Sequence, residues 1–124
     1  MAFPKIALAV PLLIAGMYLP AAGPDLQGLP AGVVGMGHEG YSRHEIDIHV
    51  GQRVTFQNDS RWIHIIGPGH DGHLSGAIKH APVDPRLLMQ QNDTYTTGRW
   101  NMPGRYQLTC SVHPEMNTTV VVTR

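Results

Sequence analysis

The segment before Cys110, the only cysteine of the chain, strongly limits what this sequence can fold into. Pro103 and Gly104 predict a turn, and the alternation that follows places Tyr106, Leu108 and Cys110 on one face of a strand. Successive side chains of a strand point to opposite faces, so these three residues share one face. Because they are largely apolar, we expect that face to be buried. The chain therefore needs a sheet with a core-facing strand that ends at the cysteine.

Other short segments with strand character, separated by turn residues, occupy most of the chain. We predict further strands at residues 33–36, 46–50, 54–56, 62–66, 95–97 and 118–122. The exception is the segment 84–92. Asp84 at its N-cap, Pro85 at its first helical position and Asn92 at its end predict a helix of about two turns. Short strands in this number predict an all-β sandwich or barrel.

Cys110, His113 and Met116 follow one another at intervals of three residues. A thiolate, an imidazole and a thioether select copper, and a blue copper site combines one cysteine, two histidines and a weak axial methionine. A second histidine must then come from elsewhere in the chain. His64 is our candidate, because it lies between Ile63 and Ile65 in an apolar segment, where a histidine needs a metal or a hydrogen-bond partner. The residues alone leave a core histidine held by hydrogen bonds as the alternative.

Together with the strand pattern that ends at Asn58, these motifs make residues 33–124 resemble the cupredoxin family, the small blue copper proteins. The spacing on both sides of His113 is similar to the short ligand loop of amicyanin-like and plastocyanin-like members. The resemblance implies an all-β Greek-key sandwich or barrel of about seven or eight strands, with the short helix at its periphery. It also implies one type 1 copper site with the ligands His64, Cys110, His113 and Met116.

One position departs from the family pattern. Family members usually follow the first histidine with an asparagine, whose side chain ties to the serine or threonine after the cysteine. This chain has Ile65 there and Ser111 after the cysteine. Outer contacts of this kind tune the metal, so the reduction potential does not follow from the resemblance. The family pattern also implies that His113 reaches the surface, where Val112 and Pro114 form an apolar collar suited to docking of a redox partner.

Two other interpretations of the motif are open at this point. A buried cysteine often behaves as a small apolar residue, and Met116 would then only pack beside Val120 and Val122. Alternatively, His113 could activate the Cys110 thiolate as a nucleophile, although the sequence offers no recognisable third group to orient the histidine.

The beginning of the chain differs in composition from the rest. We predict a signal peptide or N-terminal membrane anchor at residues 1–22, a linker at 23–30 and the cupredoxin domain at 31–124. Pro11 and Pro20 interrupt an apolar run of about 17 residues, at the lower limit for spanning a bilayer, so we favour cleavage. We therefore expect an exported, periplasmic or extracellular protein. A single unpaired thiol is a liability in an oxidising compartment, and metal ligation would remove that liability.

The remaining histidines divide into two groups. His49 alternates with apolar neighbours and is expected to face outward. His70, His73 and His80 lie in the glycine-rich segment 67–80, which we expect to be a solvated loop. A second metal site is the alternative, because histidine-rich segments can bind metals. Further ligands for it would be Met36, His38 and His44.

The expected function is transfer of single electrons between redox partner proteins. Four protein ligands leave no open position for a substrate, so we do not expect an enzyme. The alternatives are copper storage or delivery by the loop histidines and methionines, and a copper subunit tethered to a membrane redox complex. Nine basic residues balance nine acidic ones without clustering, which argues against binding of nucleic acid.

Overall fold

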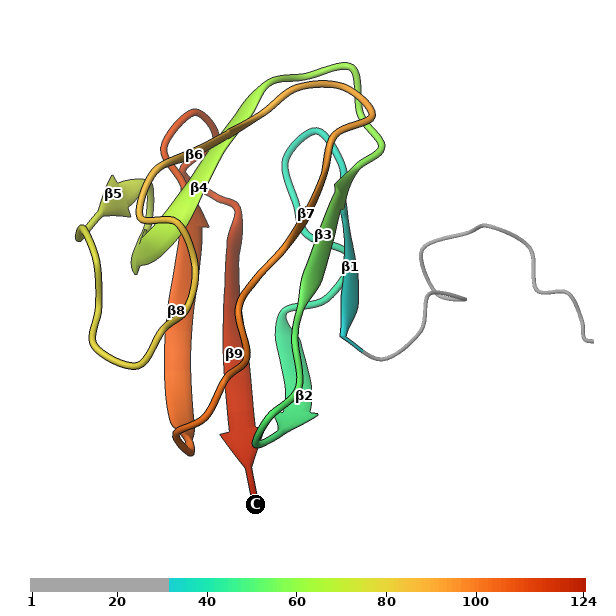
Figure 1. Cartoon of the computed structure of the whole chain (residues 1–124). Helices are drawn as coiled ribbons and strands as arrows, with labels where there is room; N and C mark the ends of the chain where they lie inside the picture. Colours follow the sequence, from blue (N-terminus) through green and yellow to red (C-terminus); the bar gives the residue numbers. More distant parts are fainter. Residues whose placement is uncertain (1–31) are drawn as a thin grey trace, which may run out of the picture.

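The computed structural model describes residues 32–124, which form β-strands in two sheets and no helix (Figure 1). In chain order the strands are β1 (Val33–Met36), β2 (Glu45–His49), β3 (Thr55–Asn58), β4 (His64–His70), β5 (His73–Leu74), β6 (Leu87–Met89), β7 (Thr94–Thr96), β8 (Gly104–Cys110) and β9 (Asn117–Thr123). The predicted all-β class is confirmed, and every predicted strand overlaps one of these. The predicted segments 1–22 and 23–30 lie outside the described residues. In the range 32–124 no helix has the length and apolar character needed to cross a membrane.

The two sheets have different sizes. The smaller has the order β1-β3-β7, with β1 and β3 parallel and β7 antiparallel to β3. The larger has the order β2-β9-β8-β4-β5, and β6 also pairs with β4. Consecutive strands β2 and β3 therefore belong to different sheets, so the chain crosses the sandwich between them.

The core lies between the sheets and is built from the alternating residues of facing strands. Ile46 and Ile48 on β2 are buried between exposed neighbours, and Val120 and Val122 on β9 pair beside them. They belong to one cluster with Phe56 from the smaller sheet. Each large apolar side chain that leaves water contributes about 1.5 to 3 kcal/mol, so this alternation is what holds the two layers together.

The helix predicted at 84–92 is wrong. Asp84 does accept a hydrogen bond from the Arg86 N–H (2.9 Å), as a cap would, but the chain then continues as strand β6 along β4. Met89 is buried and Leu88 is exposed, which is strand alternation. Asn92 has a φ of 69°, so its left-handed conformation serves a turn into β7. A helix of two turns is unstable alone, and pairing with β4 satisfies the same backbone.

The sequence predicted a solvated loop at residues 67–80, but part of this segment is β-strand. Its first residues continue β4, and β5 returns beside them as a short hairpin, pairing Gly69 with Leu74 and His70 with His73. The start of β4, the end of β8 and the loop from β8 to β9 lie at the same end of the molecule, away from the C-terminus (Figure 1). This arrangement brings the predicted ligands together.

Candidate metal centre

A cysteine sulfur and two histidine nitrogens face one another at this end of the sandwich. Cys110 Sγ lies 3.7 Å from His64 Nδ1 and 4.0 Å from His113 Nδ1, and the two Nδ1 atoms are 3.2 Å apart. The site is built by three neighbouring elements: His64 begins β4, Cys110 ends β8 and His113 lies in the loop that follows. His64 and Cys110 are fully buried, and His113 is partly exposed.

The size of this triangle fits a metal ion. The point in its plane that is equidistant from the three atoms lies about 2.1 Å from each, within the range of about 2.0 to 2.3 Å that metal–nitrogen and metal–sulfur bonds to zinc occupy in proteins. Two imidazoles and one thiolate are also the equatorial donors that copper takes in blue sites. Among residues 32–124, this is the only group of three or more histidine, cysteine or acidic residues close enough to share an ion.

Met116, the predicted axial ligand, closes the same loop. Its side chain is fully buried, and its N–H donates to the His113 carbonyl (2.9 Å). Its carbonyl accepts hydrogen bonds from the Cys110 N–H (3.2 Å) and from Thr109 Oγ1 (3.1 Å). The loop therefore holds three predicted ligands through its own backbone. That all four residues act as metal ligands stays a prediction.

Ser60 and Asn58 orient the His64 ring. Ser60 Oγ lies 3.1 Å from His64 Nε2 and donates its own hydrogen to Asn58 Oδ1 (2.7 Å), so in this network it accepts from Nε2–H. That direction leaves the His64 Nδ1 lone pair facing Cys110. Asn58 is fully buried, and its amide donates to the carbonyls of Trp62 (2.8 Å) and Met89 (3.2 Å).

Burial also keeps His64 uncharged. Loss of water around the ring lowers the pKa of His64 from 6.5 to about 4, and positive charge on His113 contributes in the same direction. At neutral pH the ring is therefore neutral and can offer Nδ1 as a ligand.

His38, considered above only for a second metal, lies beside the candidate centre. Its ring stacks on Trp62 with a centroid distance of 4.2 Å and meets His113 edge-on at 5.1 Å. Trp62, Ile63 and Val112 are 45, 48 and 46% exposed. Apolar surface is thus available at the end of the molecule where His113 lies.

Ile65, the departure from the family pattern, contributes through its backbone. The Ser111 N–H donates to the Ile65 carbonyl (2.9 Å), so the residues after the first histidine and after the cysteine are still tied together. A main-chain bond does not depend on the side chain at position 65.

The other histidines lie away from this group. His49 is exposed on β2, as predicted. His70, His73 and His80 are exposed, and within the described part of the chain they form no group with the geometry of a metal site. The idea of a second metal therefore receives no support from these residues.

Tyr41 is a buried residue beside the site that the sequence did not single out. Its hydroxyl has no hydrogen-bond partner among the described residues, and burial, followed by the charge of the Cys110 thiolate, raises the pKa of Tyr41 well above its usual value. Ser60, whose hydroxyl faces His64 Nε2, was missed as well.

Comparison with known proteins places the chain structurally. No protein-family model and no curated protein matches it. Among solved structures, an oxidised amicyanin variant matches with a TM-score of 0.56 and 22% identity over 73% of this chain and 79% of that one. A reduced amicyanin variant matches with a TM-score of 0.57 and 21% identity over 78% and 88%. A purple cupredoxin from Nitrosopumilus maritimus matches with a TM-score of 0.53 and 26% identity over 67% and 81%.

These likenesses show that the chain has the cupredoxin fold, as the resemblance implied. The histidine, cysteine, histidine and methionine at the end of the sandwich are compatible with a single type 1 copper site.

Proposed function

We propose that this protein, which has the cupredoxin fold, binds one copper ion through His64, Cys110, His113 and Met116 and carries single electrons between partner proteins. The observation that carries the proposal is the triangle of one sulfur and two Nδ1 atoms, with sides of 3.2 to 4.0 Å. With a buried methionine in the same loop, this is the donor set of a blue copper site. Copper bound there would supply one-electron chemistry by cycling between Cu(I) and Cu(II).

The chain's own contribution is to hold these donors in one geometry. Cys110 is opposite Ile66 in the β4–β8 ladder, and Ser60 holds the second nitrogen of His64. A site that is assembled beforehand has little to rearrange when an electron arrives or leaves. Four protein donors also leave no position for a substrate, which favours a carrier over an enzyme.

The partner-facing surface follows from the same geometry. His113 is partly exposed, and apolar Val112, Trp62 and Ile63 are exposed around that end. A small apolar contact surface with little charge suits brief encounters, which an electron carrier needs in order to leave its partner again.

We place this exchange outside the cytoplasm, because of the apolar N-terminal segment and the single thiol. Intact mass of native material is expected to show a start near Gly23, and a start at Met1 with detergent-dependent extraction would favour the anchored form.

Copper retention tests the proposal against copper delivery. Loaded protein is mixed with a competing metal-free acceptor, and we expect the copper to stay bound, because His64 and Cys110 are fully buried. Replacement of His70, His73 and His80 by alanine should leave copper loading unchanged. Transfer of copper to the acceptor within seconds, or failure of the triple variant to load, would replace electron transfer with delivery.

A further inference from the structure

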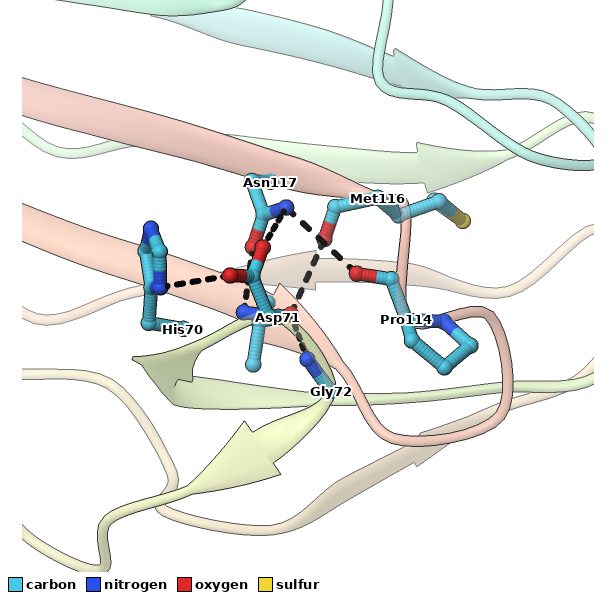
Figure 2. A network of polar contacts seen from close by, with 7 residues as sticks. His70, Asp71, Gly72, Pro114, Met116 and Asn117 are labelled. Carbon is cyan, nitrogen blue, oxygen red and sulfur yellow. Dashed lines mark hydrogen bonds and ion pairs between the residues drawn. The ribbon is translucent and has the colours of Figure 1, made fainter.

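The tip of the β4–β5 hairpin lies against the loop that carries the predicted ligands (Figure 2). The tip consists of Asp71 and Gly72, with φ angles of 50° and 84°. Aspartate followed by glycine is a preferred sequence for a two-residue hairpin turn in which both residues have positive φ. The sequence therefore specifies a firm turn at this position, although the hairpin strands themselves are short.

Asp71 and Asn117 exchange two hydrogen bonds. The Asp71 N–H donates to Asn117 Oδ1 (2.9 Å), and Asn117 Nδ2 donates to Asp71 Oδ1 (3.0 Å). The second carboxylate oxygen of Asp71 lies 3.0 Å from His70 Nδ1, but both side chains are exposed, so this contact adds little to the pair (Figure 2). Asn117 directly follows Met116, so this reciprocal pair holds the end of the ligand loop.

Gly72 makes the second connection. Its N–H donates to Thr109 Oγ1 (2.8 Å), and that hydroxyl donates to the Met116 carbonyl (3.1 Å). A Cβ atom at Gly72 would lie 2.8 Å from Pro114 Cβ, so the turn is also packed directly against the loop. The turn thus reaches the backbone of Met116 through one hydroxyl group.

The loop needs outside support because its middle is open to water. Val112, Pro114 and Glu115 are exposed, and a short exposed loop with few buried contacts opens readily. We propose that Asp71, Gly72 and Asn117 are positioning residues that hold the loop from Cys110 to Met116 in its ligand-bearing conformation before any metal binds. That this support serves metal binding rests on the proposed copper function. That the three residues hold the loop does not.

Exchange of the carboxylate and the amide tests the proposal in the metal-free protein. Asn117→Asp places one carboxylate against another, so we expect the amide hydrogens of Cys110 and Met116 to exchange with solvent at least about fivefold faster, the effect of losing one hydrogen bond. Adding Asp71→Asn returns a donor to face the new carboxylate and should restore exchange to within about twofold of wild type. Asp47→Asn, at an exposed position of β2, is the matched control and should change neither amide.

Two outcomes would overturn the proposal. One is unchanged exchange in Asn117→Asp, or failure of the double variant to recover. The other is equal acceleration of the β2–β9 amides, because the effect would then be global unfolding. In copper-loaded protein we expect Asn117→Asp to release copper several-fold faster, with recovery in the double variant. If no variant takes up copper while the exchange pattern holds, the proposed function fails and the positioning role stands.

Discussion

At the residue scale, Ser60 is a side chain that contacts the second ring nitrogen of a predicted ligand, His64. Ser60→Ala removes the partner of His64 Nε2, and we expect copper affinity to fall by about 10- to 100-fold, as for other outer contacts of metal-bound histidines. Ser75→Ala is the matched control, because that hydroxyl donates to the Pro68 carbonyl on the hairpin. Competition with a chelator of known affinity measures both variants. Equal affinity in all three proteins would mean that Ser60 does not position the ring.

Tyr41 and Tyr106 contrast a buried hydroxyl that has no partner with a more exposed hydroxyl that has one. Tyr41 Oη has no partner among the described residues, whereas Tyr106 Oη donates to the Met102 carbonyl (2.7 Å). We expect Tyr41→Phe to leave the free energy of unfolding unchanged or to raise it by up to about 1 kcal/mol, and Tyr106→Phe to lower it by a similar amount. Chemical denaturation measures both. A clear loss in Tyr41→Phe would reveal a partner of the hydroxyl that stabilises the protein.

At the scale of elements, the close approach of β4 to the segment before β6 depends on one glycine. A Cβ atom at Gly67 would fall on the carbonyl oxygen of Pro85, and backbone cannot move aside as a side chain can. We expect Gly67→Ala to lower the free energy of unfolding by about 1 to 3 kcal/mol, the usual cost of overpacking. Gly40→Ala, where nothing lies within 4 Å, is the control and should change it little. Equal stability of the two variants would show that the strands can separate at no cost.

The strands could be predicted because alternation reports burial directly. Ile46 and Ile48 carry that signal within a few residues. It is weaker at the end of β8, where Thr109 is buried as well as Leu108 and Cys110. The segment 84–92 misled because its Asp84 cap and left-handed Asn92 are turn features that a helix end shares with a short strand. Only the edge of β4, which is distant in sequence, decides between them.

The candidate site, too, could be predicted from the sequence only in part. Cys110, His113 and Met116 could be predicted as ligands from their local spacing. The prediction of His64 as a ligand required the family resemblance. The Asp71–Asn117 pair joins residues 46 positions apart, and neither residue type is unusual in a loop. Contacts of that kind follow from the tertiary fold and not from any local pattern.

At the scale of the whole molecule, His64 makes the stability of the metal-free protein depend on pH. Its pKa is lowered to about 4 in the folded state, so below pH 6.5 the unfolded chain binds a proton that the folded chain does not. We expect stability to be highest above pH 6.5 and to fall, by on the order of 3 kcal/mol, as the pH is lowered toward 4. His64→Gln should remove this part of the decline, and His49→Gln should keep it. A decline that is the same in both variants would assign it to other groups.

The absorption spectrum of the copper(II)-loaded protein tests the central claim most directly. If Cys110 supplies a thiolate to copper, wild-type protein should show an intense visible band from charge transfer between sulfur and metal. Cys110→Ser should lose that band, because a hydroxyl is a poor ligand for copper. It should remain folded, because serine has nearly the shape of cysteine and the rest of the apolar core cluster is unchanged. A colourless wild-type protein, or a band of equal intensity in Cys110→Ser, would contradict a copper centre built on this cysteine.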